Sequence, residues 1–525
     1  MVSDNSDGRI AYYTMEIGIE NDVKTYSGGL GVLAGDTIRS FADMNVPAVC
    51  VSQLNERGYC KQTLEDDGTQ ISEEDPWPVE EYCEKLDVEV TVPIHGRDVT
   101  VTAWKYDVFS EQSGHTVPII YLDTNVESND PDAREYTQRL YSPGYGEDVQ
   151  LAQEIVLGIG GTRILDELGY EVDTYHMNEG HAALLTLELL KRNDMDPEAV
   201  REQTVFTTHT PVEAGHDQFD WELVNDVLGE FVPQDVLKKY SREEDLHMTY
   251  LALNLSRYAN SVAKKHQEVS RNMFPGYDID AITNGVHVPF WVGDSFKELY
   301  DEYVEGWREN PYKLKHASVI PDDELWEAHM EEKRDTIEFI NEREGSDLDP
   351  EKLTIGFARR ATAYKRADLI FYEHERLRHI AENVGEFQIV FAGKAFPGDE
   401  DGIGNIQEIF HNAWQLNDAI NVEYVEGYDM EVGAKLTSGV DVWLNNPRRP
   451  LEACGTSGMK AAYNGIPQLG TLDGWWVEGH IENETGWKIG PEPEESEPDE
   501  TEAADEDRQD AMDMYDQLEN TVVPM

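Results

Sequence analysis

The sequence predicts an α/β protein with two lobes, each built around a largely parallel β-sheet. In the second half of the chain, short apolar runs alternate with helical segments, which is typical of βαβ units. The first half contains similar apolar runs at less regular intervals. At 525 residues the chain is long enough for two to four domains, and its 39% hydrophobic and 10% aromatic residues can form large cores. That apolar content also excludes intrinsic disorder.

The expected elements can be placed along the chain. In the first half we expect a helix over 182–191 and strands over 48–53, 117–122, 174–177, 204–208 and 279–283. In the second half we expect strands over 353–358, 388–392, 421–425, 441–444 and 467–472. Helices are expected over 322–344, 367–384, 405–415, 430–438 and 456–463.

These elements predict two lobes, at 1–288 and 289–490, joined near 289–307. The remaining segment, 491–525, begins with a strongly acidic stretch that carries eleven acids and one arginine over 491–510. We expect this stretch to be disordered or to lie on the surface, and a short helix to follow it over 511–518.

The whole chain is acidic, with 42 Lys and Arg against 106 Asp and Glu and a formal net charge of −64. Nucleic acids and anionic membranes bind cationic surfaces, so we expect neither as a partner. An acidic surface spread over a folded chain is typical of a halophilic protein, because concentrated salt screens self-repulsion. An unusually acidic protein that works in ordinary salt is the alternative.

Four cysteines, Cys50, Cys60, Cys83 and Cys454, are too few for a disulfide scaffold, and none forms a CxxC pair. Zinc fingers and thioredoxin-like redox motifs are therefore unsupported, and we expect no metal. The N-terminus lacks the basic and apolar regions of a signal peptide, and no apolar run reaches about 18 residues. We expect a cytoplasmic protein.

The first chemical motif is a glycine-rich turn, YSGGLGVLAGD, over 26–36. Such a turn before a helix lets backbone N–H groups approach a phosphate or a sugar. Dinucleotide binding is not favoured. Gly29, Gly31 and Ala34 fit only the looser GxGxxA form, and the preceding apolar run ends near Ile19, too far upstream for a tight strand-to-helix turn.

A basic segment, RRATAYKR over 359–366, follows directly on the strand expected over 353–358. Ligands of open α/β sheets bind beyond the carboxyl ends of strands, where Arg and Lys can hold phosphate. Four bases without an acid therefore indicate an anion site, and the alternative is an exposed turn paired with surrounding carboxylates. Lys394 repeats the pattern after the strand over 388–392.

A third motif, PRRPLEACGTSGMK over 447–460, leads through two glycines into a helix. The N–H groups of Gly455, Thr456, Ser457 and Gly458 could form an anion-binding helix start, with Lys460 in the first turn. A lysine beside such a phosphate site is the arrangement that holds pyridoxal phosphate. The alternative is a P-loop-like nucleotide site, but GxxxxGK[ST] is absent.

Three histidine-containing motifs, HMNEGH over 176–181, FTTHT over 206–210 and NGVH over 284–287, lie at expected strand ends. Metal binding is not favoured because the HExxH spacing is missing. We expect hydrogen bonds to sugar hydroxyls, with a buried structural histidine as the alternative for His181.

Together these segments resemble the α-glucan (glycogen/maltodextrin) phosphorylases, whose motifs occur here in the same order between Ala11 and Gly490. GTSGMK and ARRxxxYKR are the most specific of them. The resemblance implies a GT-B fold, with two Rossmann-like lobes and the active site in the cleft between them. It also implies pyridoxal phosphate as cofactor and reversible phosphorolysis of α-1,4-glucans by inorganic phosphate to give glucose 1-phosphate. A homodimer is compatible with it.

The resemblance also assigns roles by motif position. Five residues would be catalytic. Lys460 would carry the cofactor, and Glu452 would hold sugar hydroxyls. Arg360 and Lys365 would clamp the substrate phosphate, and His209 would contact the transferred glucosyl unit. Cofactor contacts are implied for Gly455, Thr456, Gly29, Tyr364 and Lys394. Substrate contacts are implied for Leu30, Asn284, Glu179, His181 and Cys454, the last at a position where the family commonly has serine.

Two rival functions stay open. A nucleotide-sugar glucosyltransferase of the glycogen synthase kind shares the two-lobe architecture but does not need the GTSGMK lysine. A glucan-binding relative with impaired catalysis is the other, because the helices that follow in longer relatives are expected to be shortened or absent here.

Overall fold

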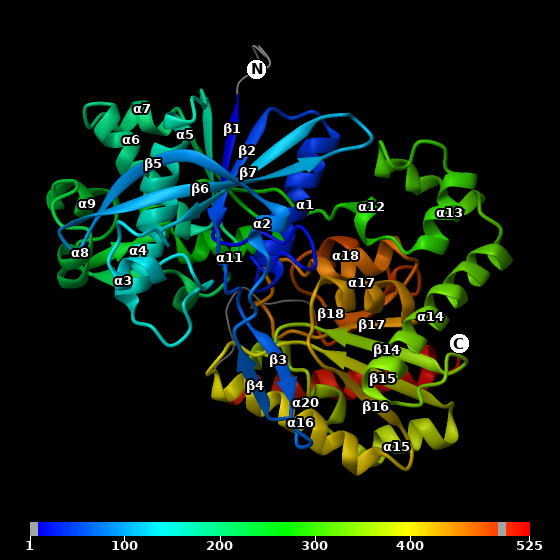
Figure 1. Cartoon of the computed structure of the whole chain (residues 1–525). Coiled ribbons are helices and arrows are strands. Elements are labelled where there is room, and N and C mark those ends of the chain that lie inside the picture. The colour runs from blue at the N-terminus through cyan, green and yellow to red at the C-terminus, as the bar shows by residue number, and fades with distance from the viewer. Residues whose placement is uncertain (1–8, 492–499) are drawn as a thin grey trace. The chain divides into compact units, whose positions relative to one another are not determined.

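The structure is a computed structural model that describes residues 9–491 and 500–525. The chain folds into two compact units (Figure 1). Unit 1 comprises 1–60, 74–262 and 270–282, and unit 2 comprises 61–73, 263–269 and 283–525. The residues 61–73 therefore belong with unit 2, although the chain on both sides of them belongs to unit 1.

Unit 1 contains a nine-stranded sheet. Its strands, in spatial order, are β13 (Ile279–Ala281), β12 (Tyr258–Ser261), β9 (Thr204–Thr207), β8 (Thr174–Asn178), β1 (Ile10–Tyr13), β2 (Ala48–Gln53), β7 (Thr116–Asp123), β6 (Arg97–Phe109) and β5 (Glu84–Ile94). The first seven are parallel, and β6 and β5 add an antiparallel edge. All five strands expected in this half are present.

The helices of unit 1 are α1 (Gly29–Asp43), α2 (Val79–Tyr82), α3 (Pro131–Glu135), α4 (Glu147–Ile155), α5 (Gly161–Glu167), α6 (Leu185–Arg192), α7 (Pro197–Arg201), α8 (Trp221–Val227), α9 (Gln234–Tyr240) and α10 (Met248–Asn254). Helix α11 (Lys264–Met273) has residues in both units. A short antiparallel pair joins β10 (Gln218–Asp220) to β11 (Asp245–His247).

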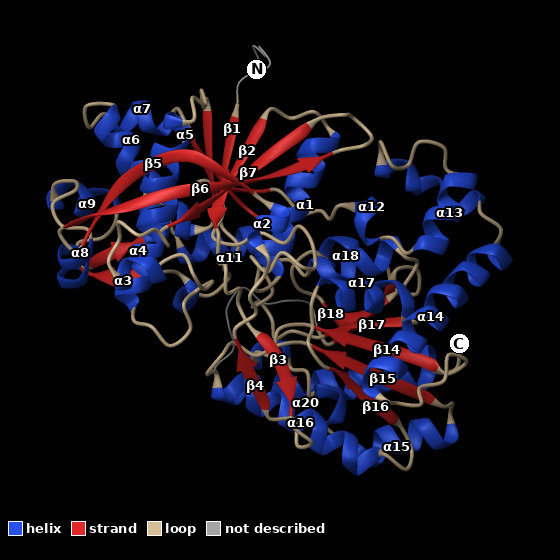
Figure 2. Ribbon diagram, in the orientation of Figure 1, coloured by secondary structure: helices blue, strands red, loops and turns tan. Residues whose placement is uncertain are grey.

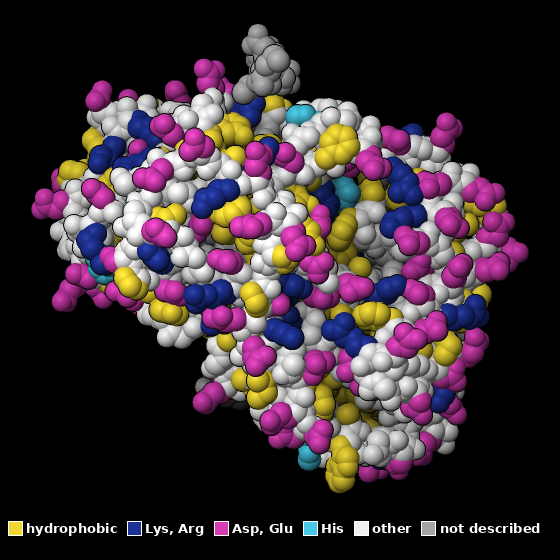
Figure 3. Space-filling view, in the orientation of Figure 1, with side chains coloured by type: hydrophobic (Ala, Val, Ile, Leu, Met, Phe, Trp, Pro, Cys, Tyr) yellow, Lys and Arg dark blue, Asp and Glu magenta, His cyan; other side chains and the backbone are white. Residues whose placement is uncertain are grey.

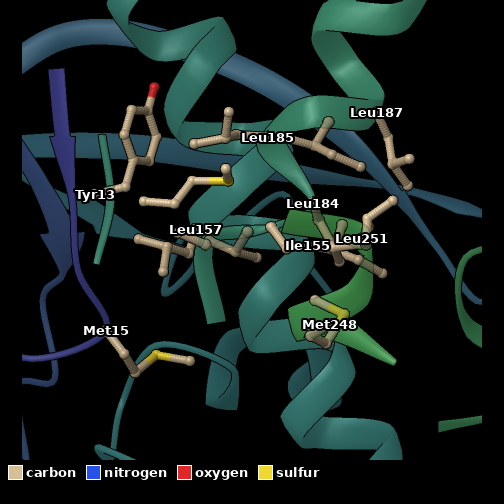
Figure 4. Close-up of a cluster of buried hydrophobic side chains, with 14 of the residues drawn as sticks. Tyr13, Met15, Ile155, Leu157, Leu184, Leu185, Leu187, Met248 and Leu251 are labelled. Carbon is tan, nitrogen blue, oxygen red and sulfur yellow. The ribbon is translucent and has the colours of Figure 1, made fainter. Parts of the chain in front are cut away.

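Apolar side chains cover both faces of this sheet. On one face, α1 packs against alternate residues of β1 and β2, and on the other face lies a larger cluster from α4, α5, α6 and α10. Figure 4 shows part of that larger cluster, with Leu157, Leu184 and Leu185 close together. Full burial of each such side chain stabilises the fold by about 1.5–3 kcal/mol.

Unit 2 contains a six-stranded parallel sheet with the spatial order β16 (Asn421–Val425), β15 (Phe387–Ala392), β14 (Leu353–Ala358), β17 (Val442–Asn445), β18 (Gln468–Thr471) and β19 (Gly486–Ile489). Counted along the chain this is the order 3-2-1-4-5-6 of doubly wound dinucleotide-binding folds. The seven parallel strands of unit 1 follow the same order with one strand added. The predicted α/β class with two Rossmann-like sheets is therefore confirmed.

The helices of unit 2 are α12 (Val288–Trp291), α13 (Asp294–Tyr303), α14 (Asp322–Glu344), α15 (His374–Asn383), α16 (Glu400–Leu416), α17 (Met430–Gly439), α18 (Thr456–Tyr463), α19 (Trp476–Gly479) and α20 (Glu500–Gln517). Alternate residues of β15 face two apolar clusters: one includes side chains of α15, α16 and α20, and the other includes side chains of α14, α17 and α18. Both faces of the sheet are thus covered, as the ribbons of Figure 2 show.

Two expected elements of unit 2 differ in the structure. The single helix expected over 367–384 is interrupted, because a turn of 3₁₀ helix over Leu369–Phe371 precedes α15. The helix expected from 511 begins at Glu500, so the acidic stretch is not wholly irregular; its residues 492–499 lie outside the described residues. Helix formation is favoured there because Asp507 and Asp510 pair with arginines of the same unit.

Carboxylates are spread over the whole visible face of the molecule, with fewer Lys and Arg among them (Figure 3). The excess of acids is therefore not confined to one segment. Among the residues that the structure describes, no helix combines the length and the apolar character that crossing a membrane requires.

Candidate active site

Three loops of unit 2 carry most of that unit's predicted phosphate and cofactor residues or lead into the helix that carries the rest, and all three follow carboxyl ends of parallel strands. The segment 359–366 follows β14, 393–395 follows β15, and 446–455 follows β17. The order of strands reverses between β14 and β17, which is where open α/β sheets bind ligands. The fold thus brings segments about 100 residues apart to one edge of the sheet.

A buried carboxylate joins two of these loops. Oε2 of Glu452 accepts hydrogen bonds from Nη2 of Arg359 at 2.5 Å and from Nζ of Lys365 at 2.6 Å. Burial alone would raise the pKa of Glu452, but the two cations outweigh it and lower that pKa, so the carboxylate stays charged. Burial and the neighbouring Arg359 lower the pKa of the Lys365 amine. The triad keeps one excess positive charge when all three groups are ionised.

The four bases of the 359–366 segment have different surroundings. Arg360, the predicted clamp, is exposed, whereas its neighbour Arg359 is buried against Glu452. Lys365 lies 4.3 Å from the ring centroid of Tyr364. Arg366 points elsewhere, to Asp507 and Asp510 of α20, so the expectation that all four bases serve one anion site is wrong for Arg366.

The Lys394 loop is held close to the 359–366 segment. The N–H of Arg359 donates to the carbonyl of Ala392 at 3.0 Å, and the N–H of Ala361 donates to the carbonyl of Lys394 at 3.0 Å. A Cβ on Gly393 would lie 1.9 Å from the carbonyl oxygen of Arg359. Glycine is therefore required for this approach, which keeps Lys394 next to the basic segment.

Helix α18 begins where the third motif predicted an anion-binding helix start. Gly455 precedes it with φ 90°, in the left-handed region that favours glycine. The first N–H groups of a helix have no partner within it and attract anions. A Cβ on Gly458 would lie 2.0 Å from Oε1 of Gln468, so a larger residue in the first turn would require the Gln468 side chain to move.

The sequence motif predicted Lys460 in the first turn of the helix. In the structure it is the fifth residue of α18 and therefore lies in the second turn. Its side chain is 8% exposed, and Nζ lies 3.4 Å from the ring centroid of Trp291. The indole face stabilises a positive charge there. No motif indicated Trp291, which lies 169 residues earlier in the chain.

Buried polar atoms without a hydrogen-bond partner surround the start of α18. Among the described residues, Nε1 of Trp475, both amide atoms of Gln468 and Oδ1 of Asn445 have none. A Cβ on Gly455 would lie 3.4 Å from the Asn445 amide and 3.6 Å from the Trp475 ring. Such atoms are usually satisfied by a ligand or by water.

Cys454 and Asn284 are brought together in unit 2. Asn284 hydrogen-bonds to the Cys454 sulfur, and burial raises the pKa of this thiol. Nearby, the N–H of Glu452 donates to Oδ2 of Asp473 at 2.8 Å. Burial and the charge of Glu452 raise the pKa of Asp473 to about 7.

In unit 1 the glycine-rich turn follows β1, at the point where the strand order reverses. Helix α1 starts at Gly29, so the N–H groups of Gly29 and Leu30 lie in its first turn. The turn rests on Glu16, which accepts hydrogen bonds from the N–H groups of Ser27 at 2.6 Å and Gly28 at 3.1 Å. The sequence motif did not indicate Glu16.

The two histidine motifs of unit 1 meet beyond β8 and β9. Glu179, with φ 72°, accepts hydrogen bonds from the N–H of His209 at 2.6 Å and from Oγ1 of Thr210 at 3.0 Å. Burial lowers the pKa of His209 to about 4, so its ring is neutral at pH 7. His181 lies on the same motif, with Nε2 3.3 Å from a carboxylate oxygen of Asp217.

The arrangement in the two units can therefore bind anions and hydroxyl groups. Neutral imidazole and carboxylate groups of unit 1 suit sugar hydroxyls, and the cations and helix start of unit 2 suit phosphate. No group of three or more His, Cys, Asp or Glu in the described part of the chain could hold a metal ion.

Comparison with known proteins identifies relatives along almost the whole chain. Residues 176–522 match the carbohydrate phosphorylase family. The chain is 39% identical to the maltodextrin phosphorylase of Thermococcus litoralis, over 98% of this chain and 66% of that protein. It is 37% identical to the glycogen phosphorylase of Aquifex aeolicus, over 98% of this chain and 80% of that protein. It is 34% identical to the glycogen phosphorylase of Mycobacterium tuberculosis, over 98% of this chain and 65% of that protein. The chain thus spans about two thirds of the length of the first and third of these relatives.

Proposed function

This chain belongs to the carbohydrate phosphorylase family, and from that premise we propose that it catalyses the reversible phosphorolysis of α-1,4-glucans to glucose 1-phosphate. The observation that best supports this is the buried Arg359–Glu452–Lys365 triad at the switch point of the unit 2 sheet. Two cations that share one carboxylate leave positive charge for an incoming phosphate. Arg360, which also follows β14, and Lys394, which follows the neighbouring strand β15, would add to this positive charge.

The triad suits a phosphate substrate in a further way. Ion-paired guanidinium and ammonium groups are already oriented, so little reorganisation is needed when the substrate binds. Glu452 fixes Arg359 and Lys365 through hydrogen bonds of 2.5 and 2.6 Å. We propose that Lys365 contacts the phosphate and that Arg359 positions Glu452.

Pyridoxal phosphate is the cofactor that the family implies, and the residues of unit 2 fit it. Lys460 would hold it through its amine, and the N–H groups of Gly455 and Thr456 would take its phosphate. The unsatisfied polar atoms of Trp475, Gln468 and Asn445 supply further partners around that helix start. When bound, the cofactor supplies a phosphate group that can exchange a proton with the substrate phosphate.

The residues of the chain would then act as follows. Lys365, Arg360 and Lys394 neutralise and orient inorganic phosphate, which protonates the glycosidic oxygen and captures an oxocarbenium-like glucosyl centre with retention. His209, Glu179, His181 and Asn284 would hold hydroxyls of the glucan. Gly29 and Leu30 would contribute backbone N–H groups. This chemistry needs no pair of catalytic carboxylates of the glycosidase type.

A phosphorolysis assay tests the proposal. Purified protein is incubated with maltodextrins of increasing length and inorganic phosphate, at several salt concentrations, and glucose 1-phosphate is measured. We expect release that depends on both substrates. Glucosyl transfer from a nucleotide sugar without phosphorolysis would instead identify a glucosyltransferase, and glucan binding without any product would identify a non-catalytic relative.

A further inference from the structure

A β-hairpin from the first half of the chain belongs to unit 2. It consists of β3 (Lys61–Leu64) and β4 (Gln70–Glu73), paired antiparallel. Two of its residues, Gln62 and Gln70, are only 2% and 5% exposed. Burying an amide side chain in so small an element is unfavourable unless its polar atoms are all hydrogen-bonded.

The amide of Gln62 is satisfied by the loop that carries Lys394. Its Nε2 donates to the carbonyl of Gly393 at 2.8 Å and to Oε1 of Gln70 at 2.9 Å. Its Oε1 accepts a hydrogen bond from the N–H of Gly427 at 3.0 Å. The side chain therefore links the hairpin to two loops of unit 2.

The amide of Gln70 binds the residue on the other side of Lys394. Its Oε1 accepts from the N–H of Ala395 at 2.9 Å, and its Nε2 donates to the carbonyl of Ala395 at 3.0 Å. The same Nε2 is 2.9 Å from Oγ of Ser72. Gln70 thus pairs with both backbone groups of Ala395, as a neighbouring strand would.

The opposite edge of this segment is paired with the basic loop. The carbonyls of Ala392 and Lys394 accept hydrogen bonds from that loop, whereas the carbonyl of Gly393 and both backbone groups of Ala395 pair with the two glutamines. The backbone around Lys394 is therefore fixed on both edges.

We infer that Gln62 and Gln70 are positioning residues for Lys394, and that they set where its ammonium group meets the substrate phosphate. This inference rests on the proposed phosphorolysis. A displacement of about 1 Å at a group that binds the reacting substrate can cost up to about 100-fold in rate. A fixed backbone at Lys394 is thus expected to matter for phosphate and not for the glucan.

Substitution by methionine, which keeps the length but removes the amide, tests the inference. We expect Gln70→Met to raise the KM for phosphate by about tenfold or more, with the KM for maltodextrin unchanged. Gln62→Met is expected to have a smaller effect, because the carbonyl of Gly393 keeps a hydrogen bond from the Tyr424 hydroxyl at 3.0 Å. It also serves as the second variant if Gln70→Met does not fold.

Thr69→Val is the matched control on the same hairpin. It removes the 2.8 Å contact between Thr69 and Gln407, which does not involve 393–395, so we expect the KM for phosphate to stay within twofold. Hydrogen exchange gives a second readout: the amide of Ala395 should exchange faster in Gln70→Met than in the wild type and in Thr69→Val.

An unchanged phosphate KM in both glutamine variants would overturn the inference, as would an equal rise of both KM values. Titration calorimetry with inorganic phosphate distinguishes failure of the positioning role of the two glutamines from failure of the proposed phosphorolysis. If the wild type releases no glucose 1-phosphate, phosphorolysis fails, and the positioning role is then decided by whether Gln70→Met weakens phosphate binding and Thr69→Val does not.

Discussion

Asp510 and Arg366 form a buried ion pair that ties the C-terminal helix α20 to the basic segment after β14. Nη2 of Arg366 lies 2.7 Å from Oδ2 of Asp510, and Nη2 of Arg449 lies 2.8 Å from Oδ1 of the same carboxylate. Asp510 is fully buried, and each arginine is only 4% exposed. Arg366 and Arg449 lie on the two loops that carry Lys365 and Glu452, so α20 holds both of these loops through the Asp510 carboxylate.

Asp510→Asn is therefore expected to destabilise unit 2. Removing one partner of a buried pair leaves uncompensated charge and typically costs about 3–5 kcal/mol. We expect the lower end, because Asp507 and Glu506 still pair with the two arginines. Calorimetry should show a thermal midpoint lowered by about 5–10 °C.

Asp516→Asn on the same helix is the control for that experiment. Asp516 pairs with Arg376 but is 62% exposed, and exposed pairs contribute at most about 1 kcal/mol. Equal thermal midpoints for the two variants would show that the buried pair of Asp510 contributes no more to stability than the exposed pair of Asp516.

The acidic stretch over 491–510 shows what could not be predicted from the local sequence. A run of acids indicates an exposed or disordered segment, and nothing local reveals that Arg366, Arg448 and Arg449 face it. These partners lie 57 or more residues away, so the longer helix α20 followed from tertiary contacts and not from the local pattern.

Most strands were predictable because their apolar runs are continuous. Helix α14 was predicted with its observed ends, which follow a proline and precede a left-handed glycine, Gly345. The strands β1, β12 and β19 were missed although they are as long as β9, β17 and β18, which were predicted, so length alone does not explain the difference. The missed strands β5 and β6 carry charged residues on a half-exposed edge.

The site was predicted as a set of motifs but not in its geometry. Two adjacent bases in one turn, Arg359 and Arg360, are equivalent in the sequence, and only packing shows that Arg359 is the buried one. Trp291 and the hairpin glutamines have no sequence motif at all. Their roles depend on contacts across 169 and about 330 residues of chain.

Lys460→Ala is expected to abolish both cofactor binding and activity. The amine is the covalent attachment point that the family implies, and no other lysine lies in α18. The visible or near-ultraviolet absorbance of the bound cofactor and the release of glucose 1-phosphate should both fall to background. Lys435→Ala on α17, which removes a peripheral pair with Asp335, should change neither. Turnover that persists in Lys460→Ala would disprove the assignment.

Lys365→Ala is expected to weaken phosphate use selectively. Hydrogen bonds to charged groups contribute about 1.5–3 kcal/mol, which corresponds to a phosphate KM about 10 to 100 times higher. The KM for maltodextrin should stay near that of the wild type. A phosphate dependence identical to the wild type would contradict the role of Lys365, and Lys352→Ala, at a peripheral pair with Glu386, is the control.

His176→Asn is expected to reduce the loss of stability in acid. Burial, followed by the effect of His209, lowers the pKa of His176 to about 4 in the folded state. As the pH falls below about 6.5, the unfolded chain therefore binds the proton first, and folded wild-type protein loses up to about 3 kcal/mol by pH 4. Thermal midpoints at pH 7, 5.5 and 4 in constant salt should show the gap between wild type and variant narrowing or reversing. A gap independent of pH would refute this effect.

Salt is expected to stabilise the protein, because its net charge is −64 and carboxylates are spread over the face seen in Figure 3. Raising potassium chloride from 0.1 to 1 M shortens the Debye length from about 10 Å to about 3 Å and screens self-repulsion. We expect the thermal midpoint to rise by about 10 °C or more, with most of the gain below about 1 M. A rise that continues in proportion to salt up to 3 M would indicate exclusion of salt from apolar surface instead. A midpoint that does not rise would contradict salt adaptation, since repulsion between the carboxylates would then not limit stability.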